Sequence, residues 1–187
     1  MSGIPSDVSK PFKAAMQSCS YAPVTKIGLQ MKQRFWETKH EIYGGQCYTD
    51  EPGIGVISLP STGWHGKKGV ILGMYGVVPS DTIRISSLPP ADRIKKALAG
   101  GQEIFPEYTE SFEAGIVKSW HLDRYNLGGW ANWTEEQRKS AYPLLCEPDG
   151  RIYLSGEHLS YLAAWQAGAI ESAWQQIGKI HARVQQT

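Results

Sequence analysis

The sequence has few cysteines, no long apolar run and almost no excess of one charge. Its three cysteines, Cys19, Cys47 and Cys146, are an odd number at wide spacings, without a CxxC pair or a histidine at a metal-ligand interval. We therefore expect reduced thiols and no metal site. No apolar run approaches the length that spans a bilayer, and the first residues lack a basic segment followed by an apolar one. These absences predict a cytoplasmic chain without a membrane segment.

Charge of the two signs is nearly balanced. The chain has 19 Lys and Arg residues against 18 Asp and Glu residues, for a net charge of +1. That balance leaves no surplus to hold a polyanion, so we expect neither a nucleic acid nor an anionic membrane as a partner. The 187 residues, 41% of them hydrophobic, suffice for a folded chain with one core. A small molecule or another protein is the expected partner.

Aromatic residues are abundant by contrast. Seven Trp, nine Tyr and four Phe make up 11% of the chain, and several of the tryptophans lie between Trp120 and Trp174. Large aromatic side chains fill cores, and they also line pockets for planar ligands. Composition does not decide between these two uses, so the positions of the aromatic residues in the sequence must be considered.

Local patterns predict a mixture of strands and helices. Between Val24 and Lys32 apolar residues alternate with polar or small ones, which predicts a half-buried strand with Lys26 on its polar side. Short apolar runs bounded by Gly and Pro predict a largely antiparallel sheet. The further expected strands are 41–49, 55–59, 70–75, 112–122 and 152–154. One helix is expected from Ser6-Asp7 to about Gln17, and another from Pro89 with an interruption at Gly100-Gly101. Two more are expected to start at Thr134 and at about Trp165, and the helical pattern is clearest in the last.

The segment from Arg151 to Ala173 is the richest in functional signals. It reads as a short strand, a turn containing glycine and an acid, a loop, and a helix that begins with small residues. The backbone N–H groups of such a helix start bind anions and polarised carbonyl oxygens, and Gly168 and Ala169 would let a flat ligand approach closely. An ordinary strand-to-helix turn has the same pattern, so the residues alone leave both interpretations open.

Three ordered blocks resemble the flavin amine oxidases, a family that includes monoamine oxidases, L-amino acid oxidases and tryptophan 2-monooxygenases. Gly156-Glu157-His158, followed by the run from Trp165 to Ser172, resembles the C-terminal FAD-binding signature of the family. The run from Val24 to Trp36 resembles the strand that carries a lysine near the flavin. Trp120, followed by the run from Gly128 to Trp133, is similar to the Trp and Gly-Gly segment of the family.

The resemblance implies roles for several residues near the reacting atoms. Lys26 matches the lysine that holds a water near flavin N5, as a catalytic group; the alternative is a solvated strand lysine. Trp165 matches an aromatic wall of the substrate cage; the alternative is a core aromatic at a helix start. Gln166 matches the position whose backbone N–H meets the pyrimidine end of the flavin, where the helix dipole stabilises charge on the reduced ring.

Other matched positions concern the cofactor and the substrate class. Gly156 and Glu157 match the turn that contacts the ribityl and pyrophosphate part of FAD, and Gly168 and Ala169 complete the implied cofactor-binding set. His158 we interpret as structural. Trp130 stands where covalent members of the family carry a cysteine, so noncovalent FAD is implied. Ala131 stands where monoamine oxidases place a second cage aromatic, which favours amino acid oxidases or monooxygenases.

The GxGxxG loop that binds the ADP half of FAD has no match in the sequence. The chain resembles about the last two-fifths of such an oxidase, which implies an α/β (mixed α+β) fold. Residues 1–122 would be part of the substrate-binding domain, with a mixed sheet. Residues 123–187 would be the closing strand, loop and helix of a Rossmann-like FAD-binding domain.

Functionally, the resemblance implies the smaller subunit or C-terminal portion of an FAD-dependent amine or L-amino acid oxidase. Such an enzyme oxidises a C–N bond by transferring hydride from the carbon that bears the amine to flavin N5, and O2 is reduced to H2O2. A partner chain would supply the GxGxxG half of the site. The alternatives are a noncatalytic remnant or interaction module that binds no flavin, and an unrelated aromatic-rich binding domain.

Overall fold

The computed structural model describes residues 8–186, and these fall into two compact units. The central unit is the segment Pro23–Gly128, and the terminal unit combines the residues up to Ala22 with those from Gly129 onward. Each unit has its own cluster of buried apolar side chains. The expectation of one core was therefore wrong, because the chain leaves the terminal unit after Ala22, completes a separate core, and returns at Gly129.

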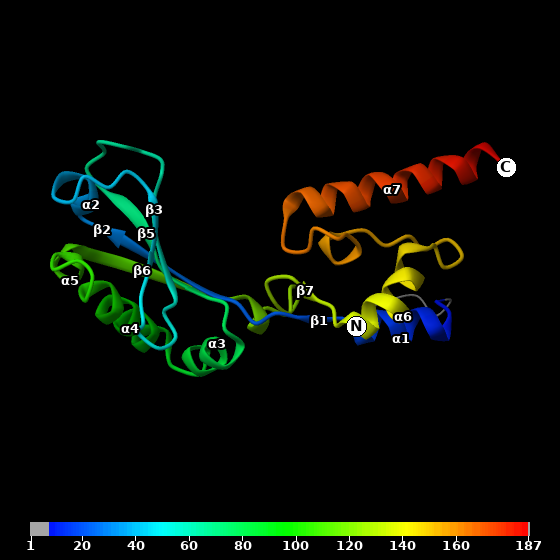
Figure 1. Cartoon of the computed structure of the whole chain (residues 1–187), viewed down its shortest axis with the longest axis horizontal. Coiled ribbons are helices and arrows are strands. Elements are labelled where there is room, and N and C mark those ends of the chain that lie inside the picture. The colour runs from blue at the N-terminus through cyan, green and yellow to red at the C-terminus, as the bar shows by residue number, and fades with distance from the viewer. Residues whose placement is uncertain (1–7, 187) are drawn as a thin grey trace. The chain divides into compact units, whose positions relative to one another are not determined.

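The central unit is built on a five-stranded antiparallel sheet with the order β3-β4-β5-β2-β6 (Figure 1). The strand β2 has a strict burial pattern: every second residue is buried and the residues between are half-buried, as the alternation predicted. The antiparallel sheet and its strands are confirmed, with edges that shift by a few residues. The bounds are β2 (Thr25–Met31), β3 (Gly45–Tyr48), β4 (Val56–Leu59), β5 (Gly69–Gly76) and β6 (Phe112–Ser119).

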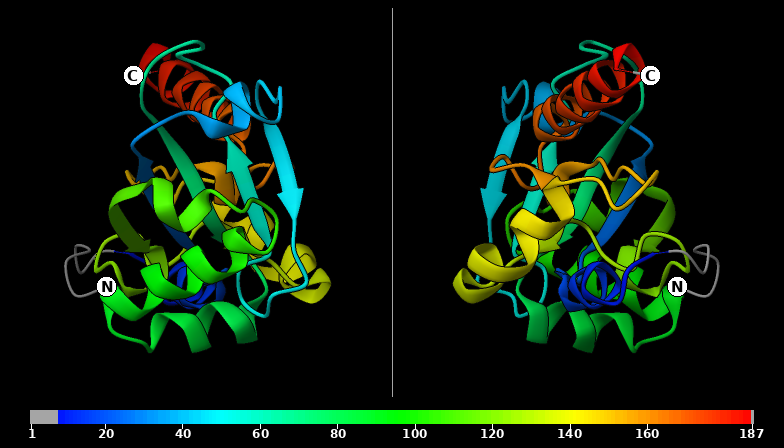
Figure 2. Two further views of the ribbon diagram at one scale, coloured as in Figure 1. Left: turned by 90° about the vertical axis from the view of Figure 1, so that its left-hand side faces the viewer. Right: turned by 90° about the vertical axis from the view of Figure 1, so that its right-hand side faces the viewer.

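Helices cover one face of this sheet, and in Figure 2 the green helices α3 and α4 lie beside each other and next to the strands. The core between α4 and the sheet includes Ile27, Leu29 and Tyr108, all fully buried. The other face of the sheet carries Lys26, Gln30 and the exposed Ile116. The helical segments are α2 (Phe35–Thr38), α3 (Pro79–Ser86), α4 (Pro90–Gln102), α5 (Tyr108–Ser111) and the 3-10 turn η1 (Trp120–Leu122).

The pair Gly100-Gly101 does not interrupt its helix, contrary to expectation, since α4 runs through both residues. A Cβ at Gly101 would overlap the ring of Tyr108, and one at Gly100 would lie 3.0 Å from Cγ1 of Ile54. The two glycines therefore allow close packing between α4 and its neighbours. That gain offsets the helix-propensity cost of glycine, which is about 1 kcal/mol per residue.

The terminal unit is mainly helical. In its core α1 packs against α6, and a two-residue strand near each end of the central insertion forms the pair β1-β7 (Figure 1). Thr134 caps α6 through a capping box with Gln137, and Ser9 caps α1. The predicted start at Ser6-Asp7 lies outside the described residues. The elements are α1 (Lys10–Ser18), β1 (Ser20–Tyr21), β7 (Ala131–Asn132), α6 (Glu135–Cys146), the 3-10 turn η2 (Glu157–Leu159) and α7 (Gln166–Gln185).

Two strand predictions need correction. The run Ile152–Leu154 is not a strand: Ile152 makes a single bridge with Asp149, three residues earlier, within a tight turn. An apolar run forms a strand only beside a partner strand, and the turn provides none. The predicted strand 112–122 ends at Ser119, where η1 begins. The compact units divide the chain after Ala22 and after Gly128, and the functional domain boundary after residue 122 stays a prediction.

Neither a membrane-spanning helix nor a metal-binding cluster of side chains is found in residues 8–186. The helices in that range are too short or too polar to cross a bilayer. No group of three or more His, Cys, Asp or Glu residues gathers there in a metal-binding arrangement.

Candidate flavin and substrate site

Lys26 lies on the uncovered face of the central sheet, on its second strand from one edge. It pairs in register with Tyr75 on β5 and Lys118 on β6. Its ammonium lies over the ring of Tyr75, with Nζ 4.7 Å from the ring centroid, and the residue is half-buried. An ammonium over an aromatic face is held in place by cation–π attraction and keeps its three N–H donors. Lys26 is thus an oriented donor, which suits the binding of a water or an anionic group.

A second lysine lies beside Lys26 on this face. The ammonium of Lys118 forms an ion pair with Asp123 and lies 5.0 Å from the ring centroid of Trp120. The hydrogen bond from Lys118 lowers the pKa of Asp123. The hydrogen bonds that Asp123 accepts from the backbone N–H groups of Tyr125 and Asn126 lower this pKa as well. The backbone N–H of Trp120 donates to the carbonyl of Val24. The matched tryptophan is therefore fixed to the start of the lysine strand.

A buried network of hydroxyl groups lies behind Lys26, on the covered face. Thr25 Oγ1 is 2.8 Å from both Ser86 Oγ and Ser119 Oγ, and Ser86 Oγ donates to the carbonyl of Thr82. Arg93 on α4 donates to Ser119 Oγ at 3.0 Å and to two backbone carbonyls. Because the guanidinium only donates and the carbonyl only accepts, each hydroxyl has a partner in both roles. The network ties the ends of β2 and β6 to the α3–α4 connection.

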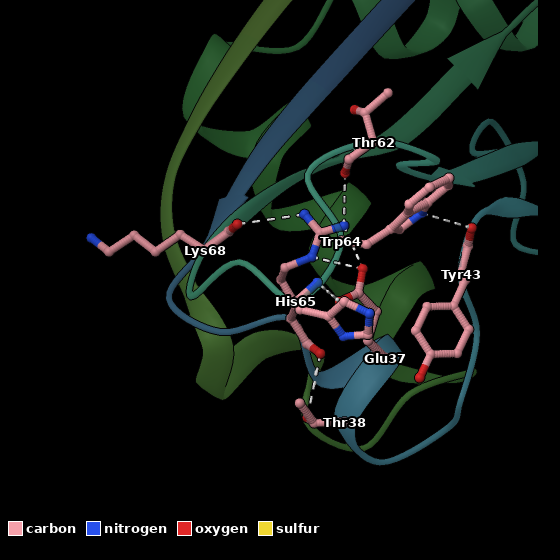
Figure 3. A network of polar contacts seen from close by, with 8 residues as sticks. Glu37, Thr38, Tyr43, Thr62, Trp64, His65 and Lys68 are labelled. Carbon is pink, nitrogen blue, oxygen red and sulfur yellow. Dashed lines mark hydrogen bonds and ion pairs between the residues drawn. The ribbon is translucent and has the colours of Figure 1, made fainter.

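The Phe35-Trp36 pair that closes the lysine block is structural. Both rings are fully buried, with centroids 5.3 Å apart in an edge-to-face arrangement. Arg34 and Glu37 flank them and form an ion pair whose side chains are each 3% exposed (Figure 3). Arg34 also donates to the carbonyl of Thr62, and the hydrogen bond from Arg34 is the main cause of the lowered pKa of Glu37. This clamp fastens the glycine-rich loop after β4 to α2.

In the terminal unit, Glu157 organises the predicted cofactor site. One carboxylate oxygen accepts a hydrogen bond from the backbone N–H of Ala131 at 2.8 Å, and the other accepts from the N–H of Ala164 at 3.0 Å. Each is a charge-assisted bond to a backbone donor. The carboxylate therefore holds the turn at 156–157, the β7 strand and the residue before Trp165 together. Contact between Glu157 and FAD stays a prediction.

Two glycines shape the backbone around this acid. Gly156 has a φ of +146°, a conformation that side chains rarely adopt, and its N–H donates to Ser172 Oγ on α7. A Cβ at Gly168 would collide with Ser160 Oγ and with the carbonyl of Leu162. Gly168 thus allows the first turn of α7 to pack directly on the preceding loop. The space beside Gly168, where a ligand was expected to approach closely, is occupied by Ser160 and Leu162.

The N-terminus of α7 has no side-chain cap. Its N-cap residue is Trp165, which provides no capping hydrogen bond, and the first helical residue is Gln166. The first-turn N–H groups of a helix lack intrahelical acceptors and carry the positive end of the helix dipole. Trp165 itself is 70% exposed and follows Ala164, whose φ is +69°. An uncapped helix start beside an exposed indole fits a planar, electron-accepting ring such as a flavin.

Trp130 and Ala131 lie next to each other at the β1-β7 pair. The carbonyl of Trp130 accepts from the N–H of Ala22, and Ala131 is buried. His158 accepts at its carbonyl from Nε1 of Trp133, and burial lowers the pKa of its imidazole. That environment agrees with the structural role expected for this histidine.

The terminal unit brings together all of the predicted site residues except Lys26, which belongs to the central unit. Sequence reasoning missed Tyr75, Lys118 and the Arg93 network. Tyr75 and Lys118 are found only once the strand register is known. The contributors to the Arg93 network are scattered between residues 25 and 119, so no local pattern signals them.

Known proteins of one family are similar to this chain. The model of the family "Flavin containing amine oxidoreductase" matches residues 2–176. The chain is 35% identical over 163 residues to the "Putative L-amino-acid oxidase YobN" of Bacillus subtilis, which covers 86% of this chain and 33% of that protein. It is 32% identical over 177 residues to an L-amino-acid oxidase of Neurospora crassa, covering 89% of this chain and 25% of that protein. The chain thus spans a third or less of these curated relatives.

Solved structures show the same fold. The cyclohexylamine oxidase of Brevibacterium oxydans superposes with a TM-score of 0.77 at 14% identity, over 97% of this chain and 39% of that one. A putrescine oxidase variant superposes with a TM-score of 0.79 at 15% identity, over 94% of this chain and 38% of that one. The predicted mixed α/β fold is confirmed. With its lysine strand, its Gly156-Glu157 turn and its matched length, the chain belongs to the family of flavin-containing amine oxidoreductases.

Proposed function

We propose that this chain supplies part of a noncovalent FAD site in an amine or L-amino acid oxidase, together with a further polypeptide that carries the GxGxxG half. The observation that carries the proposal is the uncapped start of α7, held beside the Gly156-Glu157 turn. Family membership supports a flavin. The further polypeptide is proposed because the chain covers 33% of its Bacillus subtilis relative and contains no GxGxxG.

Each unit has its own task in this proposal. The terminal unit contributes to FAD binding: the N–H of Gln166 and the dipole of α7 stabilise negative charge on the ring, and the Gly156-Glu157 turn holds the chain beside the rest of the cofactor. Gly168 and Ala169 form the packed first turn. Trp130 replaces the cysteine of covalent members, and an indole forms no thioether, so the cofactor is held without a covalent bond.

The central unit contributes Lys26, whereas the other proposed substrate residues, Trp165 and Ala131, belong to the terminal unit. When bound, FAD would supply the acceptor for the hydride that leaves the amine-bearing carbon of the substrate as an imine forms, and O2 would take up the two electrons as H2O2. Lys26, oriented by Tyr75, donates hydrogen bonds to a water needed in one of these half-reactions. Trp165 forms an aromatic wall for the substrate. Ala131 leaves the opposite wall without a ring, which favours amino acids over simple arylalkylamines. We place the assembled enzyme in the cytoplasm.

An absorbance spectrum of the chain purified from its native source, with mass spectrometry of whatever co-purifies, tests the proposal. We expect an oxidised flavin spectrum, release of the flavin by acid, and a second polypeptide with GxGxxG. Acid separates a noncovalent flavin from a covalent one, because only the former leaves the precipitated protein. A colourless chain that purifies alone would refute the proposal and support the noncatalytic remnant.

A further inference from the structure

The hydroxyl groups on the covered face of the central sheet form a chain of hydrogen bonds with two fixed ends. At one end the guanidinium of Arg93, which only donates, bonds to Ser119 Oγ at 3.0 Å. At the other end the carbonyl of Thr82, which only accepts, bonds to Ser86 Oγ at 2.7 Å. Thr25 Oγ1 lies between them, 2.8 Å from each serine oxygen, whereas the two serine oxygens are 3.1 Å apart. The path of shortest contacts from the guanidinium to the carbonyl therefore passes through Thr25.

This network joins four segments that are distant in the sequence. Thr25 starts β2, Ser119 ends β6, Ser86 ends α3, and Arg93 lies in the first turn of α4. Thr25 is fully buried and both serines are buried, while Arg93 is half-buried and also donates to the carbonyls of Leu88 and Ser86. Loss of one member would leave buried donors or acceptors without partners, which is costly in the interior. The four segments are therefore held in one arrangement at this point.

Thr25 is the chain neighbour of Lys26, and the two side chains lie on opposite faces of β2. On the uncovered face Lys26 pairs with Tyr75 and places Nζ 4.7 Å from its ring centroid. The pairing of β2 with β5 shifts register between Ile27 and Gly28, so only a short paired stretch precedes the irregularity. Because neighbouring residues share a peptide plane, a displacement of Thr25 also displaces Lys26 relative to the ring.

We propose that the hydroxyl network headed by Arg93 sets the position of Lys26 over Tyr75, and that Arg93 and Thr25 are positioning residues for the reaction in which Lys26 takes part. The network acts through the backbone of β2, from the face of the sheet opposite to Lys26. Its role in the reaction rests on the proposed function. Its effect on the place of the Lys26 ammonium is a property of the chain alone, and it is measured without flavin.

The first readout is the NMR signal of the Lys26 ε-CH2 group in the full 187-residue chain, made with lysine that carries carbon-13 at Cε. Protons held over an aromatic face are shifted upfield by the ring current, so this signal reports whether the end of Lys26 stays over Tyr75. Lys26→Arg identifies the signal by its loss. Tyr75→Leu gives the position of the signal without the ring. The second readout is the rate of each flavin half-reaction in the assembled enzyme.

The variants separate the hydroxyl of Thr25 from its shape. Thr25→Val removes the hydroxyl at nearly constant volume, Thr25→Ser retains the hydroxyl, and Arg93→Met removes the guanidinium at the other end of the network. Thr82→Val is the matched control, because Thr82 is also fully buried but its Oγ1 has no hydrogen-bond partner among residues 8–186. Replacing an unpartnered buried hydroxyl with a methyl group is nearly neutral or stabilising. Thermal unfolding verifies that each variant is folded.

We expect Thr25→Val and Arg93→Met to move the Lys26 signal toward its position in Tyr75→Leu, and Thr25→Ser and Thr82→Val to leave it at the wild-type position. In the assembled enzyme Thr25→Val should slow, by at least about tenfold, the same half-reaction that Lys26→Met slows, because misplacement of a reacting group is costly. In the Lys26→Met background Thr25→Val should add less than about twofold, since the two residues act as one unit.

A Lys26 signal at the wild-type position in folded Thr25→Val and Arg93→Met would overturn the inference. Equal slowing by Thr25→Val with and without Lys26 would also overturn it, because a general loss of structure acts in this way. A moved signal in a chain whose assembled form binds no flavin would refute the proposed function alone. A flavin-bound enzyme whose half-reactions are unchanged in Thr25→Val would refute the positioning role alone.

Discussion

The substitution Glu157→Gln tests the organisation of the terminal unit most directly. Glutamine has nearly the same shape as glutamate, but it replaces one acceptor oxygen with an NH2 group. In the native chain both carboxylate oxygens accept backbone N–H groups, one from Ala131 and one from Ala164. Only one of the two can be satisfied in the variant, and the other N–H would face a donor. We therefore expect a clear loss of stability with little change in packing volume.

The magnitude follows from the type of bond that is lost. A hydrogen bond to a charged group contributes about 1.5–3 kcal/mol, and an unsatisfied partly buried donor costs a similar amount. One of the two bonds is lost and the other loses its charge, so we expect a total of about 2–3 kcal/mol. For a chain of this length each kcal/mol lowers Tm by about 2–4 °C, which gives a decrease of about 4–12 °C.

Thermal unfolding followed by circular dichroism measures this decrease. Glu171→Gln is the matched control, since Glu171 is an exposed acid on α7 and its substitution changes the net charge by the same amount. We expect the control to stay within about 0.5 kcal/mol of the wild-type chain. If Glu157→Gln unfolds at the same temperature as Glu171→Gln, the carboxylate does not hold the two segments together and the reasoning fails.

Three further outcomes are expected. Lys26→Met in the assembled enzyme should slow one flavin half-reaction while FAD stays bound, and unchanged stopped-flow rates in both half-reactions would remove Lys26 from the mechanism. Gly168→Ala should lower the melting temperature more than Gly178→Ala on the same helix, because a Cβ at Gly168 collides with Ser160 whereas nothing lies within 4 Å of one at Gly178. Glu107 has a pKa of about 2, held low by its hydrogen bond to His40; its stabilisation is present above the unfolded pKa of about 4.3 and is lost as pH falls towards 2. As the pH falls over that range, the melting temperature should therefore decrease less steeply in Glu107→Gln than in the wild-type chain. Parallel curves would contradict the interaction between Glu107 and His40.

Local patterns predicted the elements well where burial is one-sided. Alternation defined β2 almost to the residue, and the proline and capping signals placed the starts of α4 and α6. The failures have a common physical cause. Gly100-Gly101 and Ile152–Leu154 were misjudged because their conformations depend on groups outside the local run: the side chains of Ile54 and Tyr108 permit the first, and the second has no neighbouring strand.

In the candidate site, too, local features were predicted and contacts between separate segments were not. The Gly156-Glu157 turn and the start of α7 were recognisable because their residues are consecutive. The use of the Glu157 carboxylate was not, since its two donors lie at Ala131 and Ala164. The setting of Lys26 likewise depends on Tyr75 from another strand. A sequence therefore shows which side chains a site contains more readily than which groups hold them in place.

The orientation of α7 also depends on the groups it contacts. Its periodic pattern predicts an apolar side and a polar side, and for an isolated domain the apolar side would face the core. In this chain the inward side is Gly168, Ser172 and Gln176, because those groups satisfy the backbone of the turn and of the end of α6. The periodic pattern therefore predicts the helix correctly, but its polar side faces the unit and its apolar side faces outward. The polar groups of α7 thus bind its own unit, and its apolar side stays exposed.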